Sequence, residues 1–342
     1  MVYLQGENFC FRPVFFCKGV SFTDSLILSF RLVFPIFVLL ALGFFVKKVK
    51  ILDALSAKKL NKLIFDIFLP VSIFKNVYES DFTTVFDGKL IAYSVISVIC
   101  CFLILLLTVG LICKKEESKG VLIQGIFRSN FLIFGVPVAE SLFTDGSLSG
   151  KAAVMVAIVV PVYNVLAVFC LEALSGKKSD AGKMVLNIVK NPLIIGSVCG
   201  FLGLFLKQKG VLIPDLLYGP VKQVASISTP LALIALGASL DFKTVKGNWS
   251  YIVWGVCSKL IIAPLIFITI GILIGFRDRE LAILLAMYAS PAAVSSYTMA
   301  QQMGADEHLA GHLVVFGTAV SIFTVFLWVS VLTYFGFINP VT

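Results

Sequence analysis

The stretch MYASPAAVSSYTMAQQ, from Met287 to Gln302, lies in a segment hydrophobic enough to cross a membrane, yet a proline stands near its middle. Proline inside a helix removes a backbone donor and clashes with the carbonyl one turn earlier, at a cost of roughly 3 kcal/mol. Polar side chains surround Pro291, namely Ser290, Ser295, Ser296, Thr298, Gln301 and Gln302. The stretch therefore predicts a membrane helix that is broken and carries hydroxyl groups at its break.

The composition is that of a membrane protein. Of the 342 residues, 59% are hydrophobic and only 14% are charged, and the mean hydropathy is +1.00. A soluble domain has about 25% charged residues. Runs of about 20 apolar residues recur along the chain, which predicts an all-α integral membrane protein without a soluble domain. Basic cytoplasmic loops explain the formal charge of +9, so no nucleic-acid partner is expected.

The eight cysteines indicate no metal or redox motif, because the sequence has no CxxC pair. Five of them lie in apolar runs and are interpreted as small core residues: Cys100, Cys101, Cys170, Cys199 and Cys257. Cys10 and Cys17 precede the first predicted span and could pair outside the membrane. The first twenty residues have no basic start followed by an apolar core, so we predict no cleaved signal peptide.

Ten apolar segments predict ten transmembrane helices: residues 25–46, 55–77, 89–112, 120–143, 151–174, 185–206, 213–241, 250–276, 280–303 and 308–335. The loops after the first, third and fifth segments are rich in lysine, whereas the loop after the second is mainly acidic. Since lysine is retained on the cytoplasmic side, we expect both termini outside the cell. The second half supports this orientation less well, because Lys207 and Lys209 would then lie outside.

The two halves of the chain share landmarks at similar offsets. The pairs are Pro35 with Pro192, Lys62 with Lys222, and Pro137 with Pro291. A duplicated unit of five helices enters the membrane from opposite sides, which gives an inverted repeat, the plan of many secondary transporters. We expect an extension at 1–24, a first repeat at 25–175, a cytoplasmic loop at 176–184, a second repeat at 185–335 and a tail at 336–342. Chance is the alternative, because proline is common in membrane helices.

The fourth and ninth predicted spans are both interrupted by proline. The fourth contains FGVPVAESL, with Gly135 and Pro137, and the ninth contains ASPAAVSS, with Pro291. Irregular backbone at membrane depth is tolerated only where it is buried in protein or lines a cavity. The helix that begins after each break offers N–H groups and a positive dipole end, which suit a carboxylate. We therefore predict a binding site where the breaks meet; a simple proline kink without a ligand is the alternative.

Charged residues inside membrane spans are costly and are interpreted first as functional. Asp66 lies four residues before Pro70, on the same helix face, and we expect it to be enclosed and able to carry a proton. Lys259 could attract an organic anion or neutralise an acid. A structural ion pair or a snorkelling side chain is the alternative for each, and it is favoured for Glu140, Arg31 and Arg128, which lie nearer the span ends.

Two further polar features remain. Asn130 precedes the break at Pro137 and could hold either a substrate oxygen or the broken backbone itself. His308 and His312 are four residues apart, a spacing that can hold a metal ion on one helix face. There is no HExxH order and no evident third ligand, so no metal is expected.

Five motifs together resemble the auxin efflux carrier family, in its bacterial permease branch. They are LIFDIFLPVSIF (63–74), RSNFLIFGVPVAESLF (128–143), STPLALIALGASL (228–240), SKLIIAPL (258–265) and YASPAAVSSYTMAQQMGAD (288–306). Their order and spacing carry the resemblance, which covers about residues 25 to 335. It implies the fold of plant auxin carriers and bile-acid:sodium symporters, in which two inverted five-helix repeats build a scaffold domain and a transport domain. Spans four and nine of that fold cross at their prolines.

The resemblance also implies roles for residues. Pro137 and Pro291 match the crossover prolines, Asn130 matches the asparagine of the fourth-span motif, Asp66 matches an acid near the substrate, and Lys259 matches a basic residue in span eight. Family members often have asparagine shortly after the ninth-span proline, where this chain has Ser295 and Ser296. The long loop of plant carriers between spans five and six is also missing, since only SGKKSDAGK (175–183) stands there.

The sequence thus predicts a secondary transporter of a small organic anion, either malate- or malonate-like or auxin-like, that works by an elevator mechanism in the cell membrane. The expected substrate-binding residues are Asn130, Gly135, Pro137, Pro291, Ser295 and Ser296, and those for ion coupling or charge balance are Asp66, Lys259 and Glu140. We expect a homodimer in the lipid bilayer, with H⁺ or Na⁺ as coupling ion and no other cofactor. A passive organic-anion uniporter or channel is the alternative. An enzyme is not expected, because GxSxG, HExxH and paired-aspartate motifs are missing.

Overall fold

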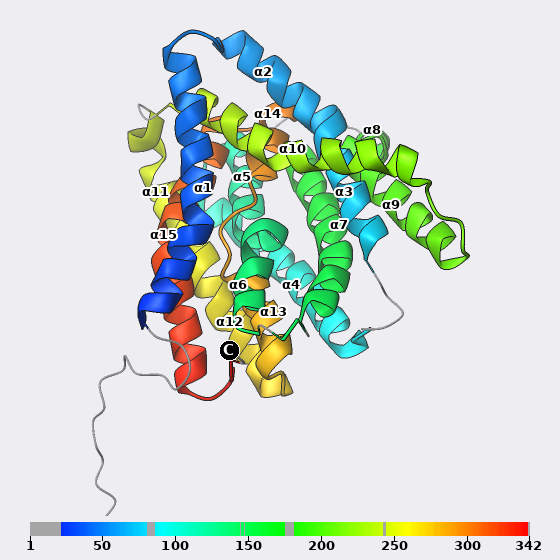
Figure 1. The fold of residues 1–342 in the computed structure, drawn as a ribbon. Coiled ribbons are helices and arrows are strands. Elements are labelled where there is room, and N and C mark those ends of the chain that lie inside the picture. Colours follow the sequence, from blue (N-terminus) through cyan, green and yellow to red (C-terminus); the bar gives the residue numbers. More distant parts are fainter. Residues whose placement is uncertain are drawn as a thin grey trace, which may run out of the picture.

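The computed structural model describes residues 22–80, 86–143, 145–146, 148–174, 181–241 and 244–340 (Figure 1). The α-helices are α1 (Phe22–Lys48), α2 (Ala54–Leu63), α3 (Leu69–Glu79), α4 (Gly88–Ile112), α5 (Glu116–Phe127), α6 (Val136–Ser141), α7 (Ser149–Ala173), α8 (Ala181–Val189), α9 (Pro192–Gln208), α10 (Asp215–Ser239), α11 (Val245–Cys257), α12 (Ala263–Ile274), α13 (Asp278–Tyr288), α14 (Ser295–Gln302) and α15 (Glu307–Tyr334). Three π-helical turns are η1 (Ile64–Phe68), η2 (Phe131–Gly135) and η4 (Ser258–Ile262). Cys10 and Cys17 lie outside the described residues.

The predicted all-α class is confirmed for the described residues. Five helical paths are long and apolar enough to cross a membrane: α4, α7, α10, α15 and the continuous path from α11 to α12. Several further apolar helices are shorter, including η2 with α6 and the helix α9. The predicted span 185–206 is interrupted between α8 and α9, because Asn191 caps α9 by accepting a hydrogen bond from the N–H of Leu193 at 3.0 Å, with Pro192 as the first residue of α9.

Each π-helical turn ends two residues before a proline. Pro70 follows η1, Pro137 follows η2 and Pro264 follows η4. Proline has no N–H, and its ring clashes with the carbonyl four residues earlier, so the helix widens by one residue at that turn. At η4 the released carbonyl is that of Leu260, which accepts a hydrogen bond from the indole N–H of Trp328 at 2.9 Å. The prolines thus place irregular turns inside helices that otherwise continue.

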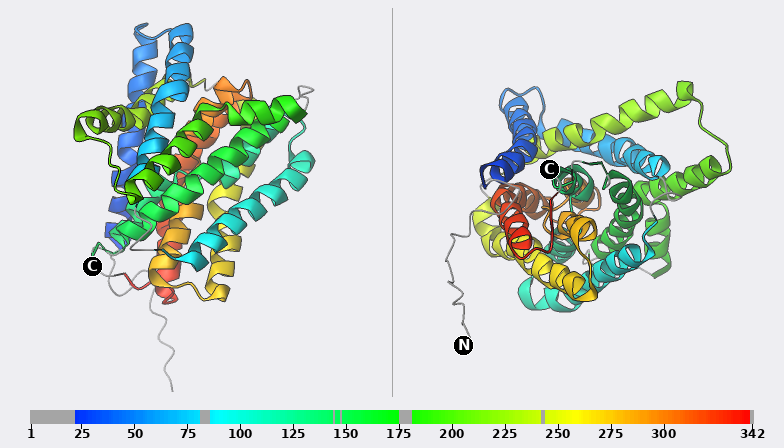
Figure 2. Two further views of the ribbon diagram at one scale, coloured as in Figure 1. Left: turned by 90° about the vertical axis from the view of Figure 1, so that its right-hand side faces the viewer. Right: turned by 60° about the horizontal axis from the view of Figure 1, so that its bottom comes forward.

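The helices α1, α3, α9 and α10 pack against one another, and Figure 2 shows this group along one edge of the molecule. The packing is close because glycines stand at the contacts. Gly43 of α1 lies against the backbone of Ile234 in α10, and Gly237 of α10 lies against the backbone of Leu40 in α1. Small residues allow this approach of helix backbones in membranes, where packing rather than burial from water holds helices together.

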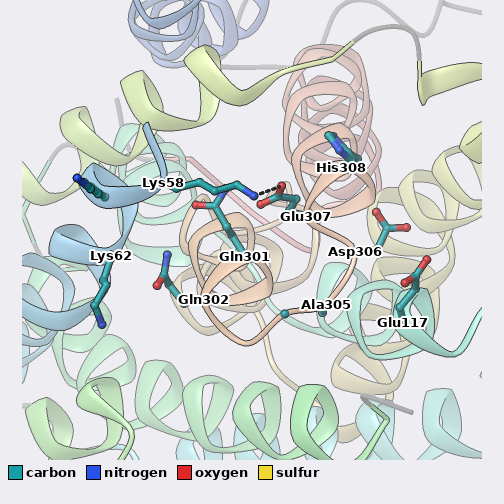
Figure 3. Close-up of a pocket in the computed structure, with 11 residues that line it drawn as sticks. Lys58, Lys62, Glu117, Gln301, Gln302, Ala305, Asp306, Glu307 and His308 are labelled. Atoms are coloured by element: carbon teal, nitrogen blue, oxygen red, sulfur yellow. Dashed lines mark ion pairs between the residues drawn. The ribbon is translucent and has the colours of Figure 1, made fainter. Parts of the chain in front are cut away.

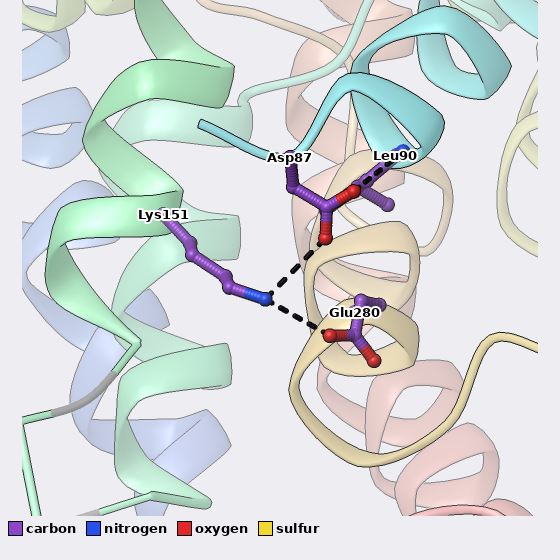
Figure 4. Close-up of polar contacts among 4 residues, drawn as sticks. All are labelled: Asp87, Leu90, Lys151 and Glu280. Atoms are coloured by element: carbon purple, nitrogen blue, oxygen red, sulfur yellow. Dashed lines mark hydrogen bonds and ion pairs between the residues drawn. The ribbon is translucent and has the colours of Figure 1, made fainter. Parts of the chain in front are cut away.

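Three of the other helices, α4, α7 and α13, are joined at one end by an ion-pair cluster (Figure 4). Lys151 at the start of α7 lies 2.9 Å from Glu280 of α13 and 3.4 Å from Asp87, which precedes α4. Asp87 also caps α4, because its carboxylate accepts a hydrogen bond from the N–H of Leu90 at 3.0 Å. The beginnings of three helices therefore meet at a single lysine.

Candidate functional site

Two breaks in the helical paths, at residues 128–130 and 289–294, lie side by side; the second contains Pro291, whereas Pro137 lies in the helix that follows the first. The backbone N–H of Asn130 donates to the carbonyl oxygen of Pro291 at 2.8 Å, and Ser129 forms an isolated antiparallel bridge with Ala292. On either side of this meeting point α5 packs on α14, and η2 and α6 pack on α13. Non-helical backbone inside a membrane protein must find internal partners. Here the backbone of one break forms hydrogen bonds with the backbone of the other.

Gly135 is required by the close approach of the two segments. It is buried, and a Cβ atom at this position would strike the carbonyl of Ala286 and the hydroxyl of Ser290, both near the end of α13. Pro137 is half-buried as the second residue of α6, and Pro291 is buried between α13 and α14. Gly135, Pro137 and Pro291, all expected to bind substrate, are not among the residues that line the adjacent cavity.

A cavity of about 90 Å³ opens beside the meeting point of the breaks. Its lining comes from α3, the first break with η2, α7, α9, α10 and the start of α14, so it lies between the group of α1, α3, α9 and α10 and the remaining helices. The polar lining residues are Ser72, Asn76, Arg128, Ser129, Asn130, Tyr163, Asn164, Thr229 and Ser295. Phe131 and Ser295, the first residues of η2 and α14, both line it. Two helix beginnings, each with a positive dipole end, therefore face the same space.

Arg128 places a buried positive charge at this cavity. Its side chain is only 4% exposed, and its guanidinium donates from Nη2 to Asn164 Oδ1 at 2.7 Å and to Ser295 Oγ at 2.8 Å. Nη1 donates to the sulfur of Met299. None of the described residues that line the cavity is an aspartate or a glutamate. A buried guanidinium held by neutral acceptors has the chemistry to bind an anion, because a buried charge is costly unless it is paired.

Further hydrogen-bonding groups in the cavity are without partners among the described residues. Asn130 Nδ2, Asn164 Nδ2, Ser129 Oγ and the hydroxyl of Tyr163 are buried and make no hydrogen bond there. An unsatisfied buried donor costs about 1–3 kcal/mol, so several in one place indicate a space built for a ligand. Asn130, expected from the sequence, belongs to this set; Ser295, also expected, lines the same cavity but its hydroxyl is bonded to Arg128.

The expectation that Arg128 lies near the end of a membrane span is wrong. Predicted span 120–143 places it near an end, but α5 stops at Phe127, and Arg128 begins the non-helical stretch in the middle of the path. Arg128 stands only two residues before Asn130, which the sequence already placed at the site, and this closeness could have indicated that Arg128 belongs to the site too. Asn164 of α7 gave no signal in the sequence, because a lone asparagine in an apolar run is not distinctive. It joins the site only because α7 packs on α5.

Ser296 behaves differently from its neighbour Ser295. Ser296 is buried but does not line the cavity, and its hydroxyl has no partner among the described residues. Its carbonyl accepts a hydrogen bond from Nε2 of Gln124 at 3.1 Å. The structure therefore brings Ser295, and not Ser296, to the arginine.

The residues expected to balance charge do not gather at the cavity. Lys259 in η4 is buried, and its Nζ atom has no partner among the described residues, but it does not line the cavity. Asp66 is not enclosed as expected: its side chain is 39% exposed and lies 3.0 Å from Lys62, which holds it on the outer face of η1. Glu140 is half-buried in α6 and also lies outside the lining.

A second and larger pocket, of about 550 Å³, lies at the far end of α14 (Figure 3). We call it the lysine pocket, after Lys58, Lys59 and Lys62 of α2. Its other lining residues are Glu117, Gln301, Gln302, Gly304, Ala305, Asp306, Glu307 and His308. Lys58 lies 3.8 Å from Glu307. Mixed charge distinguishes this pocket from the cavity at Arg128.

The two histidines of the last helix do not form a site together. His308 is exposed in the lysine pocket, whereas the ring of His312 is buried and its Nε2 lies 3.1 Å from the carbonyl oxygen of Asp241. Among the described residues, no three His, Cys, Asp or Glu side chains cluster closely enough to hold a metal ion.

Apolar spans, two broken helical paths that meet and an internal cavity with a buried arginine characterise a multi-pass membrane protein. The chain belongs to the family of membrane transport proteins, which it matches over residues 28–329. This match confirms the resemblance to auxin efflux carriers.

Its relatives are named as transporters. An uncharacterized transporter of Methanocaldococcus jannaschii is 25% identical over 307 residues, which cover 86% of this chain and 95% of the relative. The uncharacterized transporter YfdV of Escherichia coli is 23% identical, with 78% and 86% covered. A Rhizobium meliloti protein provisionally named a malonate transporter is 25% identical, with 86% and 92% covered. These names indicate a transporter rather than an enzyme.

Proposed function

We propose that this protein is a secondary transporter that carries a small organic anion, with the anion bound in the cavity at Arg128. The observation that carries the proposal is the buried guanidinium, held only by neutral groups in a cavity whose described lining contains no carboxylate. Asn130, Asn164 and Ser295 complete the site, and the helix beginnings at Phe131 and Ser295 add positive dipole ends.

The proposed architecture is an inverted repeat of five plus five spans, with the breaks at Pro137 and Pro291 forming a crossover. Support comes from the hydrogen bond between Asn130 and Pro291 and from the pairing of α5 with α14 and of α6 with α13. The cavity lies between two helix groups, which suits an elevator in which the group that contains the breaks moves against the group of α1, α3, α9 and α10. We propose the cell membrane as its location, both termini outside, and a homodimer.

The proposed secondary transporter differs from a passive uniporter or channel in that its transport is coupled to an ion gradient. Lys259 is the proposed charge-balancing residue, because its buried ammonium group has no partner among the described residues. Asp66 remains the proposed proton carrier, and H⁺ or Na⁺ the proposed coupling ion. A coupled carrier concentrates its substrate in proteoliposomes under an imposed ion gradient, whereas a passive pathway only equilibrates it.

The test is a thermal-shift screen of purified protein against mono- and dicarboxylates, at two pH values and with or without sodium. We expect at least one carboxylate to raise the melting temperature, and Arg128→Gln to abolish that rise. Arg31→Gln is the matched control, because Arg31 lies exposed on α1 and should leave the rise unchanged. If no carboxylate stabilises the protein, or if Arg128→Gln responds like the native chain, the anion site is refuted.

A further inference from the structure

We propose that the cavity selects short carboxylates that carry a single negative charge, and that it rejects the dianion of a dicarboxylate. This inference rests on the proposed function, since it narrows the substrate class of the same site. It follows from three properties of the cavity: its count of charges, the donors that remain available on Arg128, and its size.

The described lining of the cavity carries one formal charge. Arg128 is the sole charged residue among the described residues that line the cavity. The second buried cation, Lys259, stands outside the lining. A monocarboxylate therefore neutralises the charge of Arg128, whereas a dianion brings a second charge to a place without a charged partner, which is unfavourable beside buried groups.

The donors on Arg128 also favour a single carboxylate. Both hydrogens of Nη2 are engaged, one by Asn164 and one by Ser295. A carboxylate oxygen that takes the position of the Ser295 hydroxyl receives a charge-assisted bond from Nη2, and the hydroxyl is then free to donate to the same anion. The amide nitrogens of Asn130 and Asn164 have no other partner among the described residues and supply the remaining hydrogen bonds.

The opposite side of the cavity is polar but uncharged. It is formed by Ser72 and Asn76 of α3 and by Thr229 of α10, interspersed with apolar side chains such as Ile73 and Ala232. Such groups accept a hydroxyl, keto or ester substituent at the far end of the ligand. They offer no cation for a second carboxylate.

The size of the cavity favours small acids. Its volume of about 90 Å³ lies far below the roughly 300–1,000 Å³ of pockets that take drug-sized ligands. This space suits a ligand with a handful of non-hydrogen atoms better than an acid with an indole ring. Of the two substrate classes predicted from the sequence, the malonate-sized class is favoured, in its singly charged form.

Malonate and monomethyl malonate provide the test, because they have similar size but the ester carries only one charge at neutral pH. We expect monomethyl malonate to bind purified protein at least about tenfold more tightly than malonate at pH 7.5, measured by titration calorimetry. Lowering the pH should strengthen malonate binding, since hydrogen malonate is a monoanion, and should leave monomethyl malonate unaffected over the same range.

A gain-of-function variant tests the charge count directly. Asn76→Lys adds a cation on the far side of the cavity and should shift the ratio of affinities at least about tenfold towards malonate. Gln208→Lys adds the same charge at an exposed position at the end of α9 and should not change the ratio.

The outcomes separate this inference from the proposed function. If the malonate dianion binds the native protein as tightly as monomethyl malonate, or if an indole carboxylate binds more tightly than either, the monoanion proposal is overturned and the anion site stands. If none of these acids binds while another carboxylate of the screen does, this inference fails alone; if no carboxylate binds, both proposals fail.

Discussion

Asn61 of α2 donates from Nδ2 to Oε1 of Gln301 in α14 at 2.6 Å, and this bond joins two helices far apart in the sequence. Asn61 is completely buried. Gln301 lines the lysine pocket and also donates to the hydroxyl of Tyr297 at 2.9 Å. The helix α14 begins at the cavity with Ser295 and ends at the lysine pocket with Gln301 and Gln302, so the bond holds the end of α14 that lies away from the cavity.

The first prediction concerns this bond. Asn61→Leu and Gln301→Leu should each lower the free energy of unfolding, and the double variant should lose about 1 kcal/mol less than the sum, because the second change removes a partner already lost. Thermal or denaturant unfolding in detergent measures the four proteins of the cycle. Strictly additive losses would show that the bond contributes nothing, and α14 would then not be held by Asn61.

The second prediction concerns Gly135. Gly135→Ala should destabilise the protein by about 1–3 kcal/mol, because the new methyl group meets the carbonyl of Ala286 and the hydroxyl of Ser290. Gly110→Ala is the control, since nothing lies within 4 Å of a Cβ atom there. Because alanine favours a helix more than glycine does, that change in α4 should raise the free energy of unfolding by about 0.5–1 kcal/mol. Equal melting temperatures for the two variants would contradict the close approach of the broken segments.

The third prediction concerns Lys259. Lys259→Met removes a buried ammonium group that has no partner among the described residues, and should raise the free energy of unfolding by roughly 1–4 kcal/mol while reducing concentrative uptake. Lys246→Met alters an exposed lysine on the same helical path and should change the free energy of unfolding by less than about 0.5 kcal/mol. A less stable Lys259→Met protein would mean that this lysine has a counter-charge in the folded protein.

The helical paths could be predicted from the sequence because apolar runs of membrane length are a strong signal. The interruptions of these paths are harder to predict, because each depends on only a few residues. Pro291 lies within the second break, at residues 289–294, whereas the first break, at residues 128–130, precedes Pro137 by seven residues, and Pro137 itself is helical. The division at Asn191 was missed, because the apolar character of residues 185–206 continues through the cap. The π-helical turns before Pro70 and Pro264 were also invisible, since a proline in a membrane helix can produce a kink, a widened turn or a break.

The site was predicted in part. Asn130 and Ser295 were found because they flank the prolines, but the charged residues were ranked by their distance from the predicted span ends. That ranking favoured Asp66, which proves to be 39% exposed beside Lys62, over Arg128, which is buried at the cavity. Burial of a side chain depends on which face its helix presents to its neighbours, and a single apolar span gives no periodic pattern from which that face can be deduced.

The last prediction distinguishes two roles for Asp66: a structural ion pair with Lys62, or the carrier of the coupling proton. The ion pair with Lys62 is partly exposed, so Asp66→Asn should lower the free energy of unfolding by less than about 1 kcal/mol. If Asp66 carries the coupling proton, the same variant should also lose the dependence of uptake on pH, because the amide cannot release a proton. Asp215→Asn, at the start of α10, is the control and should keep the native pH profile. Uptake by Asp66→Asn that still follows the native pH profile would remove this residue from coupling and leave the charge balance to Lys259.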